Sequence, residues 1–284
     1  MSRVSSIGKY EGTRLPRAVF VCVETAIEAA RLGAEQPNHA AHLVRREMKR
    51  LRAILQLAPK PRPEWVVHLA AEAAAIHREL AELRDGCVVT ATLGKVRARH
   101  PRRWKALLPV PSDAAVAPTA RMETSWTVVG RRLGALPPLL GATGRGFSPG
   151  GDLGGALAAT YRKARRARTG VFAAIDQEAV HAWRKALYRL CYQLELAAPL
   201  LSRSARGLQQ ELAPLTQKLG RCGDLAMTSA NLKGRRLVGV KASARGDLLD
   251  WIERRRRRIA REVLTATAVH FRRRPRDFAK WCLR

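Results

Sequence analysis

Apolar residues, mainly alanine and leucine, recur at helical spacing along almost the whole chain. Side chains at positions i, i+3, i+4 and i+7 share one face of an α-helix, so this spacing predicts amphipathic helices. We find no extended segment in which β-branched and polar residues alternate, the pattern of a half-buried strand. The sequence predicts an all-α fold, with helices over residues 16–31, 40–57, 63–82, 85–98, 120–135, 152–169, 174–197, 203–219, 224–234, 246–272 and 275–283.

Two stretches interrupt the helical pattern. Residues 100–118 contain four prolines, and residues 136–154 contain three prolines and a run of glycines. Both residue types disfavour helix interiors, so each stretch predicts a break between helices. We expect one domain over residues 12–284, built from half-repeats at about 12–135 and 151–284 with a linker at about 136–150.

An internal repeat supports the division into halves. Residues 42–51 (HLVRREMKRL) align with residues 181–190 (HAWRKALYRL) at an offset of 139 residues. The same offset carries Asp85 onto Asp224 without a gap. A repeat of this length is far longer than a solenoid unit, so it predicts a duplicated helical bundle with about four helices in each half.

Each repeat copy is expected to form a helix with one cationic face. At 100° per residue, the basic side chains of the first copy lie within about 80° of its histidine, and its leucines lie opposite. Basic residues three and four positions after a histidine would repel a metal ion, but they suit successive phosphates along a groove. One such helix could be an ordinary solvated amphipathic helix. Its recurrence at the same register favours a binding face.

Composition narrows the class of partner. Lysine and arginine number 53 against 23 aspartate and glutamate, a formal net charge of +30, although 46% of the residues are hydrophobic. The chain is too apolar to be a disordered basic tail. So large a charge of one sign causes self-repulsion, which suggests a polyanionic partner such as nucleic acid, an anionic membrane or another phosphate polymer.

Other sequence features exclude several classes. No stretch approaches 18 uninterrupted apolar residues, and the N-terminal residues lack the apolar core of a signal peptide. We therefore expect a cytoplasmic protein without a membrane partner. The five cysteines lie far apart, without the spacing of a zinc site or the density of a disulfide framework, so we expect buried thiols.

The repeated motifs resemble the CHAD family, the conserved histidine α-helical domain. The resemblance rests on H-x-x-R-x-x-x-K-R-L-R at residues 42–52 and H-x-W-R-K-x-x-x-x-L-x-Y-x-L-E-L at residues 181–196, with TYRKARR at 160–166 and RPRDF at 274–278. It implies two helical bundles related by pseudo-twofold symmetry. Their basic faces are expected to line a central channel or cleft that binds inorganic polyphosphate. It also implies association with polyphosphate granules in bacteria.

The second half departs from the family pattern at Tyr188, where lysine is common, at Cys191, and at Gly223, where histidine is common. We therefore expect it to supply fewer cations, with arginines of the preceding helix compensating. The predicted polyphosphate-binding residues are His42, Arg45, Arg46, Lys49, Arg52, Arg162, Arg165, Arg166, His181, Arg184, Lys185 and Arg189.

Three functions are weighed on this basis. Non-enzymatic binding of polyphosphate is favoured, with no catalytic residue, metal or cofactor. Nucleic-acid binding is the alternative, but aromatic residues are only 5% of the chain, so stacking platforms for single strands are scarce. A phosphohydrolase acting on polyphosphate is the least favoured, because no cluster of carboxylates for a catalytic metal is visible.

Two further basic clusters lie outside the repeat motifs. Residues 254–258 are five consecutive arginines, which cover more than one helical turn and cannot all face one groove. We expect some of them to reach the channel and others to extend a general basic surface, with an ordinary solvated face as the alternative. Six basic residues between positions 95 and 105 surround Trp104. That indole could stack on a nucleic-acid base, although a packed anchor is the commoner role.

Overall fold

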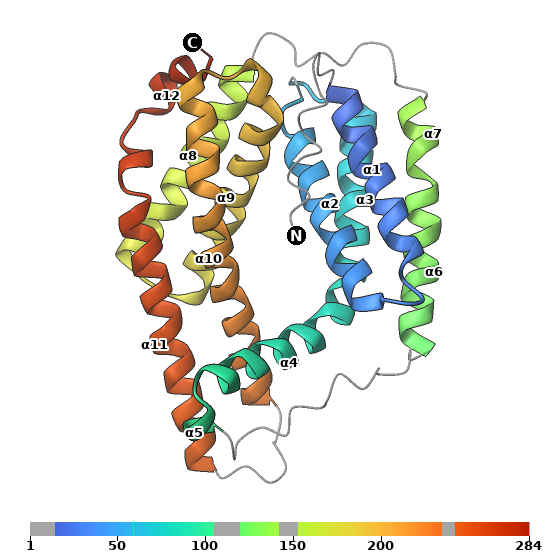
Figure 1. Cartoon of the computed structure of the whole chain (residues 1–284). Helices are drawn as coiled ribbons and strands as arrows, with labels where there is room; N and C mark the ends of the chain where they lie inside the picture. The colour runs from blue at the N-terminus through green and yellow to red at the C-terminus, as the bar shows by residue number, and fades with distance from the viewer. Residues whose placement is uncertain (1–14, 59, 105–119, 142–152, 235–241, 284) are drawn as a thin grey trace.

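Helices are the regular elements of the chain. The computed structural model describes residues 15–58, 60–104, 120–141, 153–234 and 242–283, and within these ranges every element is a helix (Figure 1). The all-α prediction is confirmed. The helices form two groups that stand on either side of the molecule in Figure 1.

The N-terminal group contains α1 (Leu15–Arg31), α2 (Pro37–Leu55), α3 (Glu64–Glu79), α6 (Ala120–Gly134) and α7 (Leu136–Gly141). Helix α1 shows why they pack: Val19, Cys22, Val23 and Ala26 follow the helical spacing and are all buried. At the turn into α2, a Cβ on Gly33 would come within 2.8 Å of the Trp126 ring on α6. Glycine at this turn therefore permits close packing of α6 against it.

The C-terminal group contains α8 (Leu153–Ala173), α9 (Gln177–Ala197), α10 (Arg203–Gly234), α11 (Ala242–Ala266) and α12 (Pro275–Cys282), with 3₁₀ turns at Ala198–Leu200 and Val269–Phe271. Helix α9 begins with a side-chain cap, because Asp176 accepts a hydrogen bond from the backbone N–H of Ala179 at 2.7 Å. The buried ring of Tyr161 stacks on Phe271 and Phe278, at 5.2 and 3.9 Å between centroids. These aromatic contacts hold the last helix against α8.

One helix crosses between the groups. Helix α4 (Ala81–Arg99) leaves the N-terminal group and packs against α10, and the short α5 (Pro101–Trp104) follows it beside the lower end of α11 (Figure 1). Trp104 is buried, so it is a packed anchor rather than an open stacking platform. The path of α4 fixes the two groups relative to one another.

The clearest correction concerns α10. The sequence predicts separate helices over 203–219 and 224–234, but α10 is continuous from Arg203 to Gly234. The interval between the two predicted helices contains Gly220 and Gly223, but glycine inside a helix costs only about 1 kcal/mol, which packing against neighbouring helices can offset. Helices α5 and α7 also form inside the predicted breaks, while residues 105–119 and 142–152 lie outside the described part of the chain.

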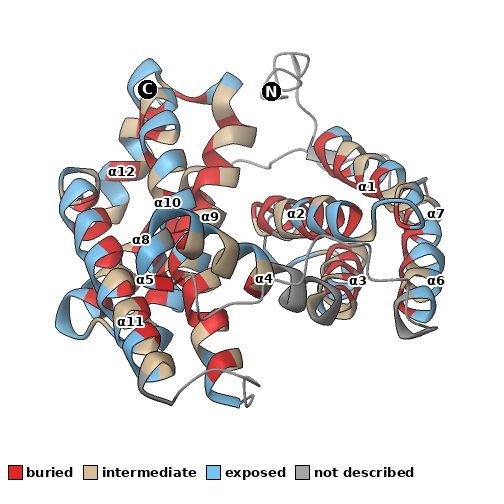
Figure 2. Cartoon of the chain, turned by 60° about the horizontal axis from the view of Figure 1, so that its bottom comes forward, coloured by how far each residue is buried: buried red, intermediate tan, exposed pale blue. Residues whose placement is uncertain are grey.

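Burial follows the expected helix faces. Figure 2 shows buried positions on the sides of helices that face other helices, with exposed positions outside. Four cysteines, Cys22, Cys191, Cys222 and Cys282, are buried free thiols, as predicted, while the side chain of Cys87 is outside the described residues. Within the described residues, no helix is both long and apolar enough to cross a membrane.

Candidate functional site

The two repeat helices, α2 and α9, pack directly against each other and join the two groups. Arg50 Nη2 of α2 donates to Glu195 Oε1 of α9 at 3.1 Å. In the opposite direction, Gln193 Nε2 of α9 donates to the carbonyl oxygen of Ala53 at 2.9 Å. Burial raises the pKa of Glu195, and the nearby Arg50 opposes that rise. Polar contacts between largely enclosed groups therefore fix how the repeat helices meet.

Four cations gather beside this interface, and we call them the cationic seam: Lys49, Arg52, Arg62 and Arg189. Lys49 Nζ of α2 lies 5.1 Å from the ring centroid of Tyr188 on α9, so the two helices meet through a cation–π contact. The pKa of Arg189 is lowered by burial and then by the charges of Arg52 and Arg62. Guanidinium groups from α9, α2 and the α2–α3 connection are therefore close enough to repel one another.

The three arginines of the cationic seam are not neutralised by acids of the described residues. No carboxylate in the described part of the chain lies within ion-pair distance of Arg52, Arg62 or Arg189. Repulsion between like charges costs free energy in the folded protein unless an anion relieves it. Guanidinium groups present planar forks of donors that match phosphate oxygens. The arrangement is suited to an extended anion.

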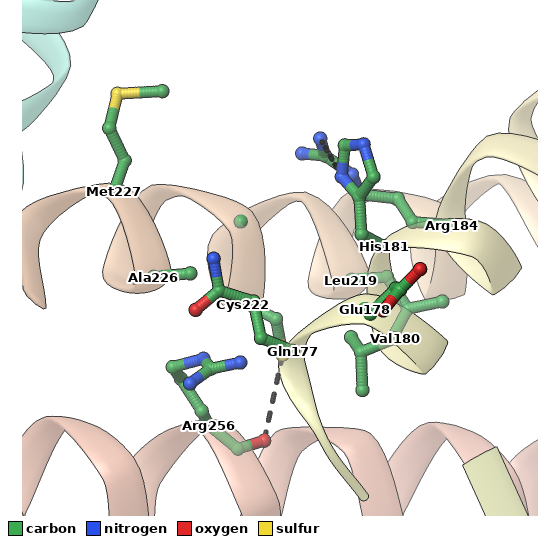
Figure 3. Close-up of a pocket in the computed structure, with 11 residues that line it drawn as sticks. Gln177, Glu178, Val180, His181, Arg184, Leu219, Cys222, Ala226, Met227 and Arg256 are labelled. Atoms are coloured by element: carbon green, nitrogen blue, oxygen red, sulfur yellow. Dashed lines mark hydrogen bonds between the residues drawn. The ribbon is translucent and has the colours of Figure 1, made fainter. Parts of the chain in front are cut away.

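A second group of predicted residues lines a cavity of about 500 Å³ between α9, α10 and α11 (Figure 3). Arg184 Nη2 donates to His181 Nδ1 at 3.3 Å on one side of this cavity, and Arg256 of α11 lies on another. Burial lowers the pKa of His181, and the charges of Lys185 and Arg184 lower it further. The imidazole is thus biased toward its neutral form.

Two glycines of α10 seat the side chains of α9. The guanidinium of Arg184 lies against Gly223 so closely that a Cβ there would meet its Nη1 atom and come within 2.8 Å of its Cζ. A Cβ on Gly220 would lie 3.3 Å from the hydroxyl oxygen of Tyr188. Gly223, which in sequence is only a departure from a family pattern, therefore makes room for a predicted site residue. In the sequence, the spacing of three positions between Gly220 and Gly223 was the signal that large side chains of a neighbouring helix could pack there.

The predicted residues of α2 do not share one environment. His42 and Arg46 are exposed, and Arg46 Nε pairs with Glu47 Oε1 at 2.9 Å. Arg45 is only 9% exposed, and its Nη1 donates to the backbone carbonyl of His77 on α3 at 2.7 Å. The expectation that Arg45 lies on an open cationic face is therefore wrong, because its guanidinium reaches into the N-terminal group.

The predicted arginines of α8 lie elsewhere. Arg165 Nη1 donates to the carbonyl oxygen of Arg273 at 3.5 Å, in the segment before α12, while Arg162 and Arg166 are exposed. The structure thus brings Lys49, Arg52 and Arg189 together at the cationic seam. It collects His181, Arg184 and Lys185 at the start of α9. Of the three α8 arginines, Arg165 contacts the C-terminal segment, and Arg162 and Arg166 are exposed.

Sequence reasoning missed two cations. Arg62 lies in a connection with prolines on both sides, where helical periodicity gives no signal. Arg256 belongs to the five-arginine run, whose members could not be assigned to faces without the helix's neighbours. Within the described residues, no group of three or more histidine, cysteine, aspartate or glutamate side chains is placed to hold a metal ion.

Comparison with known proteins adds two findings. A family model described as the CHAD domain matches residues 22–233. A similar solved structure, the crystal structure of the CHAD domain from the plant Ricinus communis, is 21% identical with a TM-score of 0.50, covering 94% of this chain and 89% of that chain. At this identity the likeness concerns the fold alone. No curated protein matches the chain.

Proposed function

The chain belongs to the CHAD domain family, and we propose that it binds inorganic polyphosphate at the cationic seam without catalysing a reaction on the polymer. The observation that carries this proposal is the convergence of Arg52, Arg62 and Arg189 from three segments without a described carboxylate partner. A linear chain of phosphates can contact all of these groups at once. It would release counterions as it binds, so its affinity should fall as salt rises.

The predicted residues at the start of α9 would extend the binding surface. The cavity at the start of α9 adds Arg184, whose guanidinium lies between His181 and Gly223. We infer that this cavity and the cationic seam belong to one basic channel or cleft, which longer polymers would follow. A protein that holds long chains in this way is expected to associate with polyphosphate granules in the cytoplasm.

The proposal includes an internal duplication. Its support is that α1 and α2 begin at residues 15 and 37, whereas α8 and α9 begin at residues 153 and 177, spacings close to the 139-residue offset of the sequence repeat. The repeat helices would then face one another across a pseudo-twofold axis, and cations from both copies would meet at the interface. Duplication gives a simple reason for this convergence.

The test is a titration with long-chain polyphosphate at roughly 150 mM salt, where non-specific binding to polyanions is weakened. Single-stranded RNA, duplex DNA and heparin, matched by charge, serve as competitors. We expect polyphosphate to bind tightly and to resist displacement by excess nucleic acid. If every polyanion displaces polyphosphate equally well, the protein has only a non-specific basic surface. Nucleic-acid binding would then be the favoured function.

A pair of variants locates the site. Arg52→Gln with Arg189→Gln removes two cations of the seam, and we expect affinity for long-chain polyphosphate to fall at least about tenfold, because each lost bond to a charged group contributes roughly 1.5–3 kcal/mol. Arg203→Gln with Arg206→Gln removes the same charge from exposed positions of α10 and is the matched control. Equal losses in the two double variants, with unchanged helicity, would overturn the proposed location.

A further inference from the structure

The five-arginine run of α11 is divided among different environments. Arg256 is 9% exposed and pairs with Glu253 at 2.6 Å, and Arg257 pairs with the same carboxylate at 2.9 Å. Arg254, Arg255 and Arg258 instead line a separate cavity of about 440 Å³, together with Trp251. These four lining residues follow the i, i+3, i+4, i+7 spacing and therefore share one face of the helix.

The opposite wall of this cavity comes from the end of α4, where Arg99 and His100 complete its lining. The imidazole of His100 meets the indole of Trp251 edge to face, with 5.4 Å between ring centroids. Trp251 also contacts the buried Trp104, at 6.5 Å between centroids. The aromatic wall is thus anchored in the core, so the arginines are held around a shaped volume rather than on a loose surface.

The charge of this cavity is only partly compensated. Arg258 pairs with Glu262 at 3.1 Å. No carboxylate among the described residues lies within ion-pair distance of Arg99, Arg254 or Arg255, and none lines the cavity. Four guanidinium groups around one concavity would repel each other in the absence of an anion. The volume falls in the range of small-molecule sites, so the fitting anion is compact and multiply charged.

We propose that this cavity binds a short oligophosphate, either free inorganic tripolyphosphate or the triphosphate of a nucleotide. Several phosphates in one ligand would engage guanidinium forks from both walls, α4 and α11, which a single phosphate cannot span as well. In a nucleotide, the base would lie against Trp251 and His100. None of the lining residues belongs to the cationic seam, so this site does not depend on the polymer binding proposed above.

The experiment is calorimetric titration of the full chain with tripolyphosphate and, separately, ATP at roughly 150 mM salt. The site variant is Arg99→Gln with Arg255→Gln, and the matched control is Arg257→Gln with Arg261→Gln, which removes the same charge from exposed positions of α11. We expect one ligand per chain, at least tenfold weaker binding in the site variant, and less than a twofold change in the control. Thermal melts confirm that each variant is folded.

Additional variants separate the ligand sources and the two proposed sites. Trp251→Leu should weaken ATP more than tripolyphosphate if the nucleotide is the ligand, and should weaken the two equally if the free oligophosphate is. The seam variant, Arg52→Gln with Arg189→Gln, should bind the short ligand as the parent does. This inference is wrong if the short ligand does not bind one-to-one, or if the site and control variants weaken binding equally. Neither result would contradict the proposal for long polymers.

Discussion

The two repeat helices carry the same motif but use its arginine differently. In the N-terminal group, Arg45 is buried and donates to the carbonyl of His77, while in the C-terminal group the corresponding Arg184 lines an open cavity. The difference comes from the partner helix. Helix α3 ends at Glu79, so the carbonyl of His77 lies in its last turn, where backbone carbonyls commonly accept from side chains, and it accepts from Arg45.

Helix α10 does not end at the corresponding place. It runs from Arg203 to Gly234, so the carbonyls facing Arg184 are already bonded within the helix. Arg184 instead lies against Gly223 and contacts His181. A repeated motif can thus be structural in one copy and available to a ligand in the other, depending on whether the neighbouring helix stops.

The continuity of α10 can be tested by interrupting this helix at the position that corresponds to the junction of α3 and α4. Gly220→Pro removes a backbone hydrogen bond inside the helix and clashes with the preceding turn, so we expect it to lower the free energy of unfolding by about 3 kcal/mol or more. Gly220→Ala is the control, with an expected change within about 1 kcal/mol. Urea denaturation measures both. Similar values for proline and alanine would show that α10 is not continuous.

The two arginines themselves provide the next test. Arg45→Ala removes a charge-assisted bond to the end of α3 and should lower the free energy of unfolding by roughly 2 kcal/mol. Arg184→Ala, at a cavity wall, should change it by less than about 0.5 kcal/mol and should weaken polyphosphate binding instead. Chemical denaturation of the two variants under the same conditions measures both changes in the free energy of unfolding. Equal destabilisation would contradict the proposed difference between the copies.

Gly223 allows the position of the Arg184 guanidinium to be changed without removing the side chain. Gly223→Ala should raise the free energy of unfolding by up to about 1 kcal/mol, because alanine is the better helix former and the group it would meet is the flexible end of Arg184. The displaced guanidinium should alter polyphosphate affinity at the same time. Gly207→Ala, where a Cβ would meet nothing within 4 Å, provides a stability gain without that displacement. Unchanged affinity in both variants would exclude Arg184 from the site.

The smallest expected effect is a pH dependence. The pKa of His181 is lowered in the free protein by burial, Lys185 and Arg184, and a bound polyanion would raise it again. Binding should then take up a proton. The affinity for polyphosphate should therefore rise as the pH falls through the range between the pKa of His181 in the complex and its lower pKa in the free protein. The rise is at most tenfold per pH unit, because one proton is taken up.

Glu178, Arg184 and Arg256 line the same cavity and set the field that this imidazole experiences. Titrations in buffers of different ionisation enthalpy measure the proton uptake directly. His181→Gln should remove it, whereas His68→Gln, at an exposed position of α3, should leave it intact. Uptake that survives His181→Gln would assign the proton to another group.

The sequence alone determined the fold class, most helix positions and the apolar face of each repeat helix. Trp183, Leu187, Leu190 and Leu194 are fully buried, as the helical pattern predicted. These properties are local, because burial of a stripe follows directly from the spacing of apolar residues along one helix. The family resemblance was also readable, since it rests on contiguous motifs.

Which cations remain available for a ligand depends on how the helices pack. Whether Arg45 is buried or exposed depends on where α3 ends. The cationic seam includes Arg62 because the connection after α2 brings this residue close to Arg189. Likewise, the members of the five-arginine run separate according to the helices that face α11. Such outcomes are set by partners distant in the sequence, and helical periodicity carries no information about which helix stands opposite or where it stops.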